Sequence, residues 1–141
     1  MFEYIEMDIS HYTEANALWN STEGMGVTND PEEKIQEYLN HNPGMSFVCI
    51  DQTNSKLAGT VLGGHDGRRG FIYHLAVPKE YRGKAIGKKL VQLSVDAMKK
   101  EEIERCIIMV KAHNDGGHGF WSNIGWESRP DLCMYSVDLT K

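Results

Sequence analysis

The sequence lacks the features that mark membrane proteins and disulfide-stabilised secreted domains. Its 141 residues contain no apolar run long enough to cross a bilayer, and the stretch Met1 to Glu3 lacks the basic residues of a signal peptide. The cysteines Cys49, Cys106 and Cys133 are odd in number and widely spaced, which fits neither a disulfide framework nor a zinc cluster. We therefore expect a cytoplasmic protein with reduced cysteines, no metal site and no membrane contact.

Excess positive charge is also lacking, as are internal repeats and low-complexity segments. Lys and Arg number 15 against 20 Asp and Glu, and the formal net charge of -5 argues against a nucleic-acid partner. The cations are nevertheless concentrated locally, with Arg82, Lys84, Lys88 and Lys89 close together. Such a cluster favours an anionic ligand. The length suits one domain that spans residues 1–141.

The region from Phe71 to Lys100 organises the chain. Phe71 to Val77 is an apolar and aromatic run that predicts a strand, and Pro78 ends it because proline has no N–H to donate. From Ile86 the apolar residues recur at helical spacing, which predicts a long helix beginning near Lys84. The connecting loop would place free N–H groups and a positive helix end beside a strand terminus, which favours phosphate binding. Taken alone, the loop also fits an ordinary strand-turn-helix connection with a cationic rim.

The other segments predict an α/β protein in which a mixed central sheet carries helices on both faces, in the order βααβββαβαββ. Asp30 is expected to be the N-cap of a helix with Pro31 in its first turn. Strands are expected to close the chain, one of them around Leu132 to Val137. The expected strands include residues 2–9, 46–50, 57–62, 71–77, 105–110 and 132–137, and the expected helices are residues 10–19, 31–39, 84–100 and 117–124.

Two stretches resemble the GNAT superfamily of N-acetyltransferases. The family's pyrophosphate loop reads Gln or Arg, two residues, Gly, one residue, then Gly or Ala, and Arg82, Ala85 and Gly87 stand in those places. The middle glycine is thus replaced by Ala85, which is tolerable if its φ is negative. A second stretch matches the family's segment after the fifth strand through Asn114, Gly117, Phe120, Trp121, Gly125 and Trp126. Residues 59–64 with 66–67 further resemble small bacterial members of the YpeA type.

The resemblance implies acetyl-CoA as co-substrate and an amine acceptor, which is a small molecule, a peptide or a protein. It implies that strand backbone holds the pantetheine arm, that the loop holds the pyrophosphate, and that the later stretch contacts the arm and the thioester end. It leaves a homodimer open. The implied cofactor-binding residues are Leu75, Ala76, Val77, Arg82, Gly83, Lys84, Ala85, Ile86, Gly87, Lys88, Asn114, Phe120 and Trp121.

The implied reaction is direct acetyl transfer, which needs a base more than an acid. Deprotonating an alkylamine of pKa ~10.4 at pH 7 costs about 4.6 kcal/mol, whereas a thiol of pKa ~8.5 leaves as thiolate for about 2 kcal/mol. His74 and Tyr73 are the candidate catalytic residues, because they precede the implied cofactor-binding backbone and histidine has a suitable pKa. A hydrogen-bonded strand histidine without catalytic role is the alternative. Asp66 is a weaker candidate because Asp66-Gly67 is itself a turn signal.

The general acid is harder to place. Trp121 stands where many relatives have a tyrosine, and an indole N–H cannot act as an acid near neutral pH. Tyr81 and Tyr135 are phenols to which the sequence gives no role. With Ala85, Trp121 also supports a different function, a non-catalytic acyl-CoA sensor or regulatory module.

The acceptor pocket is expected between the first two helices. By resemblance, Trp19, Glu23 and Met25 would help to form it, and an acidic group there would suit a cationic amine.

Overall fold

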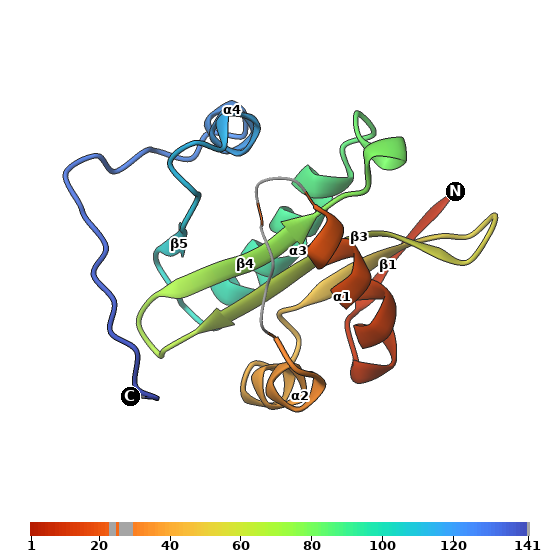
Figure 1. Ribbon diagram of the computed structural model, residues 1–141, viewed down its shortest axis with the longest axis horizontal. Helices are drawn as coiled ribbons and strands as arrows, with labels where there is room; N and C mark the ends of the chain where they lie inside the picture. Colours follow the sequence, from red (N-terminus) through yellow and green to blue (C-terminus); the bar gives the residue numbers. More distant parts are fainter. Residues whose placement is uncertain (23–24, 26–29, 141) are drawn as a thin grey trace.

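The computed structural model describes residues 1–22, 25 and 30–140, which form the mixed sheet predicted from the sequence (Figure 1). The strands lie in the order β1-β2-β3-β4-β5. The first three junctions are antiparallel, and β4 pairs with β5 in parallel. The strands are β1 (Phe2–Glu6), β2 (Phe47–Asp51), β3 (Lys56–His65), β4 (Gly70–Ala76) and β5 (Cys106–Ile108).

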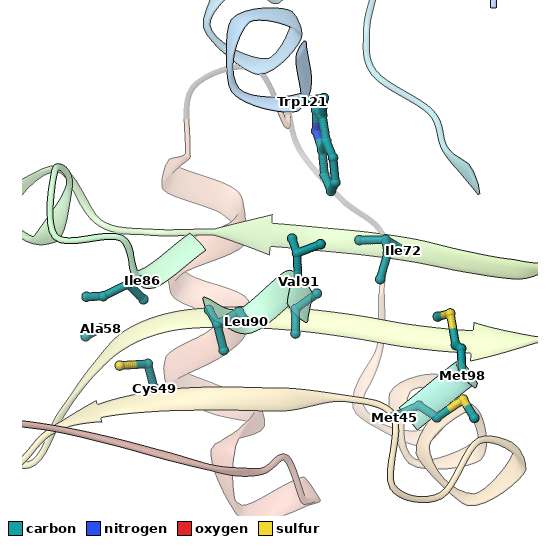
Figure 2. Close-up of a cluster of buried hydrophobic side chains, with 10 residues drawn as sticks. Met45, Cys49, Ala58, Ile72, Ile86, Leu90, Val91, Met98 and Trp121 are labelled. Carbon is teal, nitrogen blue, oxygen red and sulfur yellow. The ribbon is translucent and has the colours of Figure 1, made fainter. Parts of the chain in front are cut away.

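Helices cover both faces of this sheet, as predicted. Helices α1 (Tyr12–Ser21) and α2 (Glu32–His41) pack on one face, and α3 (Ile86–Lys100) and α4 (Asp115–Asn123) pack on the other. Two separate apolar clusters result. The cluster under α3 and α4 contains Met45, Cys49, Ala58, Val61, Ile72, Ile86, Leu90, Val91, Met98 and Trp121 (Figure 2). The cluster under α1 and α2 contains Met7, Ala15, Trp19, Ile35, Val48, Leu57, Leu62 and Ala76.

Helix α3 lies unusually close to β3. Its Ile86, Leu90 and Met98 are buried at helical spacing, and Ser94 Oγ donates a hydrogen bond to the Met45 carbonyl at 2.7 Å. The approach requires Gly63, because a Cβ there would stand 2.4 Å from the Met45 carbonyl oxygen and 3.0 Å from Ser94 Oγ. This packing fixes where the N-terminus of α3 points.

The C-terminal part differs from the prediction. Residues 132–137 form no strand, and β5 comprises only Cys106–Ile108 instead of residues 105–110. The apolar side chains of the expected strand are exposed, with Leu132 at 61% and Tyr135 at 94%. An alternating sequence decides which face of a strand is apolar, but a strand forms only where a partner edge accepts its hydrogen bonds. The element order in the described residues therefore ends at α4.

Two short 3-10 helices complete the fold, η1 (Ile9–His11) before α1 and η2 (Lys79–Tyr81) after β4. None of the helices in the described ranges has the length and apolar character that crossing a membrane requires.

The close contact at Gly63 predicts a clear effect on stability. Gly63→Ala is expected to lower the free energy of unfolding by about 1–3 kcal/mol, because backbone must move to admit the methyl group. Gly119→Ala in α4 is the matched control, since a Cβ there meets nothing within 4 Å and helix propensity favours alanine. Urea unfolding of both variants measures the difference. Equal stability of Gly63→Ala and wild type would contradict this account of the packing.

Candidate functional site

Strand β4 pairs with β5 over only the first part of its length. It pairs with β5 from Gly70 and Cys106 to Ile72 and Ile108. Beyond this point β4 continues to Ala76, whereas the chain leaves β5 toward α4 (Figure 1). On this side residues 73–77 have no strand partner in register within the described part of the chain. An extended ligand can bind such a backbone edge as an added strand.

The pairing of β4 with β3 contains a β-bulge at His74. The register passes from Leu62 opposite Tyr73 to Thr60 opposite Ala76, so two residues of β4 oppose one of β3. His74 has φ 49, a left-handed conformation that costs a non-glycine residue about 1 kcal/mol or more. Strain of this kind persists only where neighbouring contacts hold it.

The bulge brings both predicted catalytic residues to the face of the sheet that carries α1 and α2. The Tyr73 ring stands edge-on to Tyr38 of α2, with ring centroids 6.2 Å apart. The His74 ring lies against Trp19 of α1, with centroids 4.6 Å apart. Successive side chains of a regular strand point to opposite faces, so the shared position of these two depends on the bulge.

The His74 side chain is paired with Asp30. Its Nε2 lies 2.6 Å from Asp30 Oδ2, and the two side chains are 19% and 30% exposed. An ionised carboxylate only accepts hydrogen bonds, so in a neutral His74 ring beside it the proton would stand on Nε2 and the lone pair on Nδ1. Among the described residues, none is hydrogen-bonded to His74 Nδ1. This nitrogen is therefore the one that can take a proton.

The role of Asp30 corrects the sequence analysis. Pro31, not Asp30, is the N-cap of α2, because the Asp30 carboxylate bonds His74 instead of the first helical N–H groups. Sequence reasoning missed this partner because Asp-Pro reads as a helix start and its histidine lies 44 positions away.

The Trp19 ring packs against the His74 ring inside the core and does not line an open pocket. It is 0% exposed, which contradicts its expected place in the acceptor pocket: an indole on the apolar stripe of α1 packs into the core. Its Nε1 donates to Thr60 Oγ1 at 2.9 Å, and Thr60 Oγ1 donates to the His74 carbonyl at 2.9 Å. Met25 packs against the same cluster, and Glu23 lies outside the described residues.

The loop between β4 and α3 has a backbone conformation that suits anion binding. Gly83 and Ala85 both have left-handed backbones, with φ 80 and φ 63, and α3 begins directly afterwards at Ile86. Left-handed residues before a helix start turn successive N–H groups toward one point, where the helix dipole is positive. The condition under which alanine would be tolerated without strain, a negative φ, is not met at Ala85. Alanine bears a cost of about 1–2 kcal/mol for the left-handed conformation.

Two hydrogen bonds anchor this loop to the sheet. Arg82 Nε donates to the Val77 carbonyl at 3.0 Å, which links the loop to the end of β4. Tyr81 OH donates to Asp51 Oδ2 at 2.6 Å, and this bond raises the pKa of Tyr81. Tyr81 therefore serves as an anchor. Tyr135, the other phenol without an assigned role, is 94% exposed in the C-terminal segment.

The cations of the loop remain available to a ligand. Lys84 and Lys88 are exposed, as is Lys89, and none of the three forms an ion pair with another described residue. Their charges therefore add to the positive end of α3.

Helix α4 closes the site opposite β4. Asn114 is its N-cap, and Asn114 Oδ1 accepts a hydrogen bond from the Gly117 N–H at 2.9 Å. The Phe120 ring packs on the first turn of α3, where a Cβ at Gly87 would stand 3.2 Å from Phe120 Cε1. The small residue at 87 thus lets α4 approach α3, in addition to any contact with a ligand.

Trp121 belongs mainly to the core. It is 8% exposed and points from α4 toward Ile72 and Val91 (Figure 2). Its ring lies 4.5 Å from that of Trp126, centroid to centroid. Its predicted contact with the thioester end of a donor stays a prediction.

The pKa of Asp51 predicts how the loop anchor responds to acid. Hydrogen bonds from Tyr81 and then Thr53 lower this pKa from 3.8 to about 2. A folded-state pKa below the unfolded value gives stability that is present above about pH 4 and is lost as the pH falls toward 2. The difference in unfolding free energy between wild type and Asp51→Asn should therefore shrink between pH 4 and pH 2.

Urea unfolding at a series of pH values measures that difference. Tyr81→Phe is the control, because it removes the main hydrogen-bond donor to Asp51. In this variant the free energy of unfolding should depend less on pH between pH 4 and pH 2 than in wild type. A difference that stays constant over this pH interval would contradict the assigned role of Asp51.

Comparison with known proteins agrees with this geometry. The chain is 31% identical to an acetyltransferase of Pectobacterium atrosepticum over 79% of this chain and 77% of that one. It is 29% identical to an acetyltransferase of Yersinia pestis over 87% and 86%. A GNAT-family acetyltransferase of Staphylococcus aureus has a similar structure, with TM-score 0.80, 22% identity and coverage of 99% and 94%. Since the model of the acetyltransferase (GNAT) family also matches residues 12–126, the chain belongs to the GNAT family of acetyltransferases, which use acetyl-CoA as co-substrate.

Proposed function

We propose that the protein acetylates an amine by direct transfer, with acetyl-CoA and the amine bound together in a ternary complex. The early end of the β4–β5 pairing at Ile72 and Ile108 carries the proposal, because it leaves a strand edge that leads directly to the N-terminus of α3. A chain with amide groups can bind the edge, and a pyrophosphate can bind the helix end.

The residues present suit this donor. The backbone of Leu75, Ala76 and Val77 would hold the pantetheine arm. N–H groups of the loop and first turn would hold the pyrophosphate, with cationic side chains around them; these residues are Arg82, Gly83, Lys84, Ala85, Ile86, Gly87 and Lys88. Asn114, Phe120 and Trp121 would close the arm from the side of α4.

An alkylammonium first loses one proton, which frees the nitrogen lone pair and costs about 4.6 kcal/mol at pH 7. Transfer then forms a bond between this nitrogen and the acetyl carbon, breaks the carbon–sulfur bond and releases a second proton from the nitrogen, which can pass to the departing thiolate. Release of the thiolate costs about 2 kcal/mol. A base is thus the larger need. His74 Nδ1 is our candidate, and Tyr73 is a neighbour that would border the acceptor.

The alternative, a non-catalytic sensor, gains no support from the conformation of Ala85. Ala85 adopts the conformation that glycine would supply, so the substitution leaves the shape of the loop intact. A cytoplasmic location is supported by Cys49, Cys106 and Cys133, which are all free thiols.

Thiol release from acetyl-CoA across a panel of amines tests the proposal. Wild type should turn over with at least one class of amine. Lys88→Glu should weaken acetyl-CoA binding about tenfold or more, because it places a negative charge beside the phosphates. Lys99→Glu, also exposed but at the far end of α3, is the matched control and should bind as wild type does. Absence of thiol release with every amine, or equal binding by both variants, would count against the proposal.

Trp121 provides a second test. Trp121→Phe should keep turnover near the wild-type value, since no proton donor is lost, while the cavity in the core lowers the free energy of unfolding by about 1–3 kcal/mol. Steady-state kinetics and urea unfolding separate the two effects. A large loss of turnover with acetyl-CoA affinity preserved would show that the indole N–H takes part in the reaction.

A further inference from the structure

His74 is contacted by residues from three parts of the chain that are distant in sequence. Its carbonyl accepts a hydrogen bond from Thr60 of β3, its ring lies against Trp19 of α1, and its Nε2 meets the carboxylate of Asp30 just before α2. Thr60 and Trp19 alone would hold the backbone and one side of the ring. The carboxylate adds control over which ring nitrogen is protonated.

We infer that Asp30 is a positioning residue for acetyl transfer: it holds His74 in the tautomer with the proton on Nε2 and thereby presents Nδ1 to the acceptor amine. The inference rests on the proposed function. Asp30 itself would touch neither substrate, and it would act only through His74.

A purely structural ion pair is less consistent with the geometry. The two side chains are half-buried, at 19% and 30% exposure, and such a pair is weak evidence for a stabilising role, because the cost of removing charges from water offsets much of their attraction. At the same time His74 carries the backbone strain of φ 49, which an ordinary strand residue in its place would avoid. Strained backbone clusters at active sites, and a carboxylate bound to an imidazole fixes its tautomer and orientation in Ser-His-Asp triads.

The backbone of Asp30 is held in place by a separate hydrogen bond. Tyr12 OH donates to the Asp30 carbonyl at 2.6 Å, so α1 fixes the main chain while the side chain reaches His74. This bond does not involve the carboxylate and remains in Asp30→Asn. The substitution therefore changes the hydrogen-bonding character of the side chain with little change in shape.

The test compares Asp30→Asn with two other variants. Asp30→Glu keeps a carboxylate and should retain part of the activity. Asp96→Asn is the matched control, because Asp96 is exposed on α3 and accepts a hydrogen bond from the Gln92 side chain at 2.8 Å. Asp30→Asn is expected to lower kcat about 10- to 100-fold with the KM for acetyl-CoA within about twofold. Asp96→Asn should match wild type in both constants.

Nitrogen-15 NMR of the imidazole rings supplies a readout that a merely structural role would not move. The chain has 6 histidines, and the His74 signals are assigned by their loss in His74→Gln. At a pH where the ring is neutral, wild type should show the Nε2-protonated tautomer, and Asp30→Asn should show a mixture or the Nδ1-protonated form. A wild-type pattern and wild-type kcat in Asp30→Asn would overturn the inference.

The two proposals fail in different ways. If wild type releases no thiol with any amine, the proposed function fails, whereas the NMR spectra still decide whether Asp30 sets the tautomer of His74. If wild type is active but Asp30→Asn and Asp96→Asn have the same kcat, the proposed function stands and the positioning role of Asp30 is wrong.

Discussion

The site depends on the different pairing of the two edges of β4. On one side the strand pairs with β3 along most of its length, and on the other it pairs with β5 only as far as Ile72. Backbone groups that another strand would occupy in a complete sheet therefore remain for a ligand. The proposed donor site also needs a helix N-terminus near this edge. The packing of α3 across Gly63 provides it, since it directs the N-terminus of α3 to the point where β4 ends.

The bulge at His74 combines two functions in one strand. A regular strand would divide Tyr73 and His74 between the two faces of the sheet. The extra residue turns both toward α1 and α2, while the edge proposed for the donor is unchanged. The proposed donor edge and the proposed acceptor face would thus meet at the same residues, as direct transfer between two bound substrates requires.

The sequence predicted those parts of the molecule that local rules control. The strand before Pro78, predicted to end at Val77 and observed to end at Ala76, follows from the chemistry of proline, and the amphipathic α3 and the glycine-containing loop follow from periodicity and from the chemistry of glycine. It could not predict features set by contacts between distant residues. The bulge at His74, its pairing with Asp30 and the hydrogen bond of Tyr81 to Asp51 all join separate elements, and whether residues 132–137 pair with a strand is likewise a matter of contacts far along the chain.

Ala85 has a consequence for the energetics of donor binding. A glycine at this position would sample many backbone conformations in the free protein and would lose that freedom when phosphate binds. An alanine, here at φ 63, has fewer conformations to lose than a glycine. Part of the conformational cost of shaping the loop would thus be met during folding, which would reduce the entropy lost on binding the proposed phosphate.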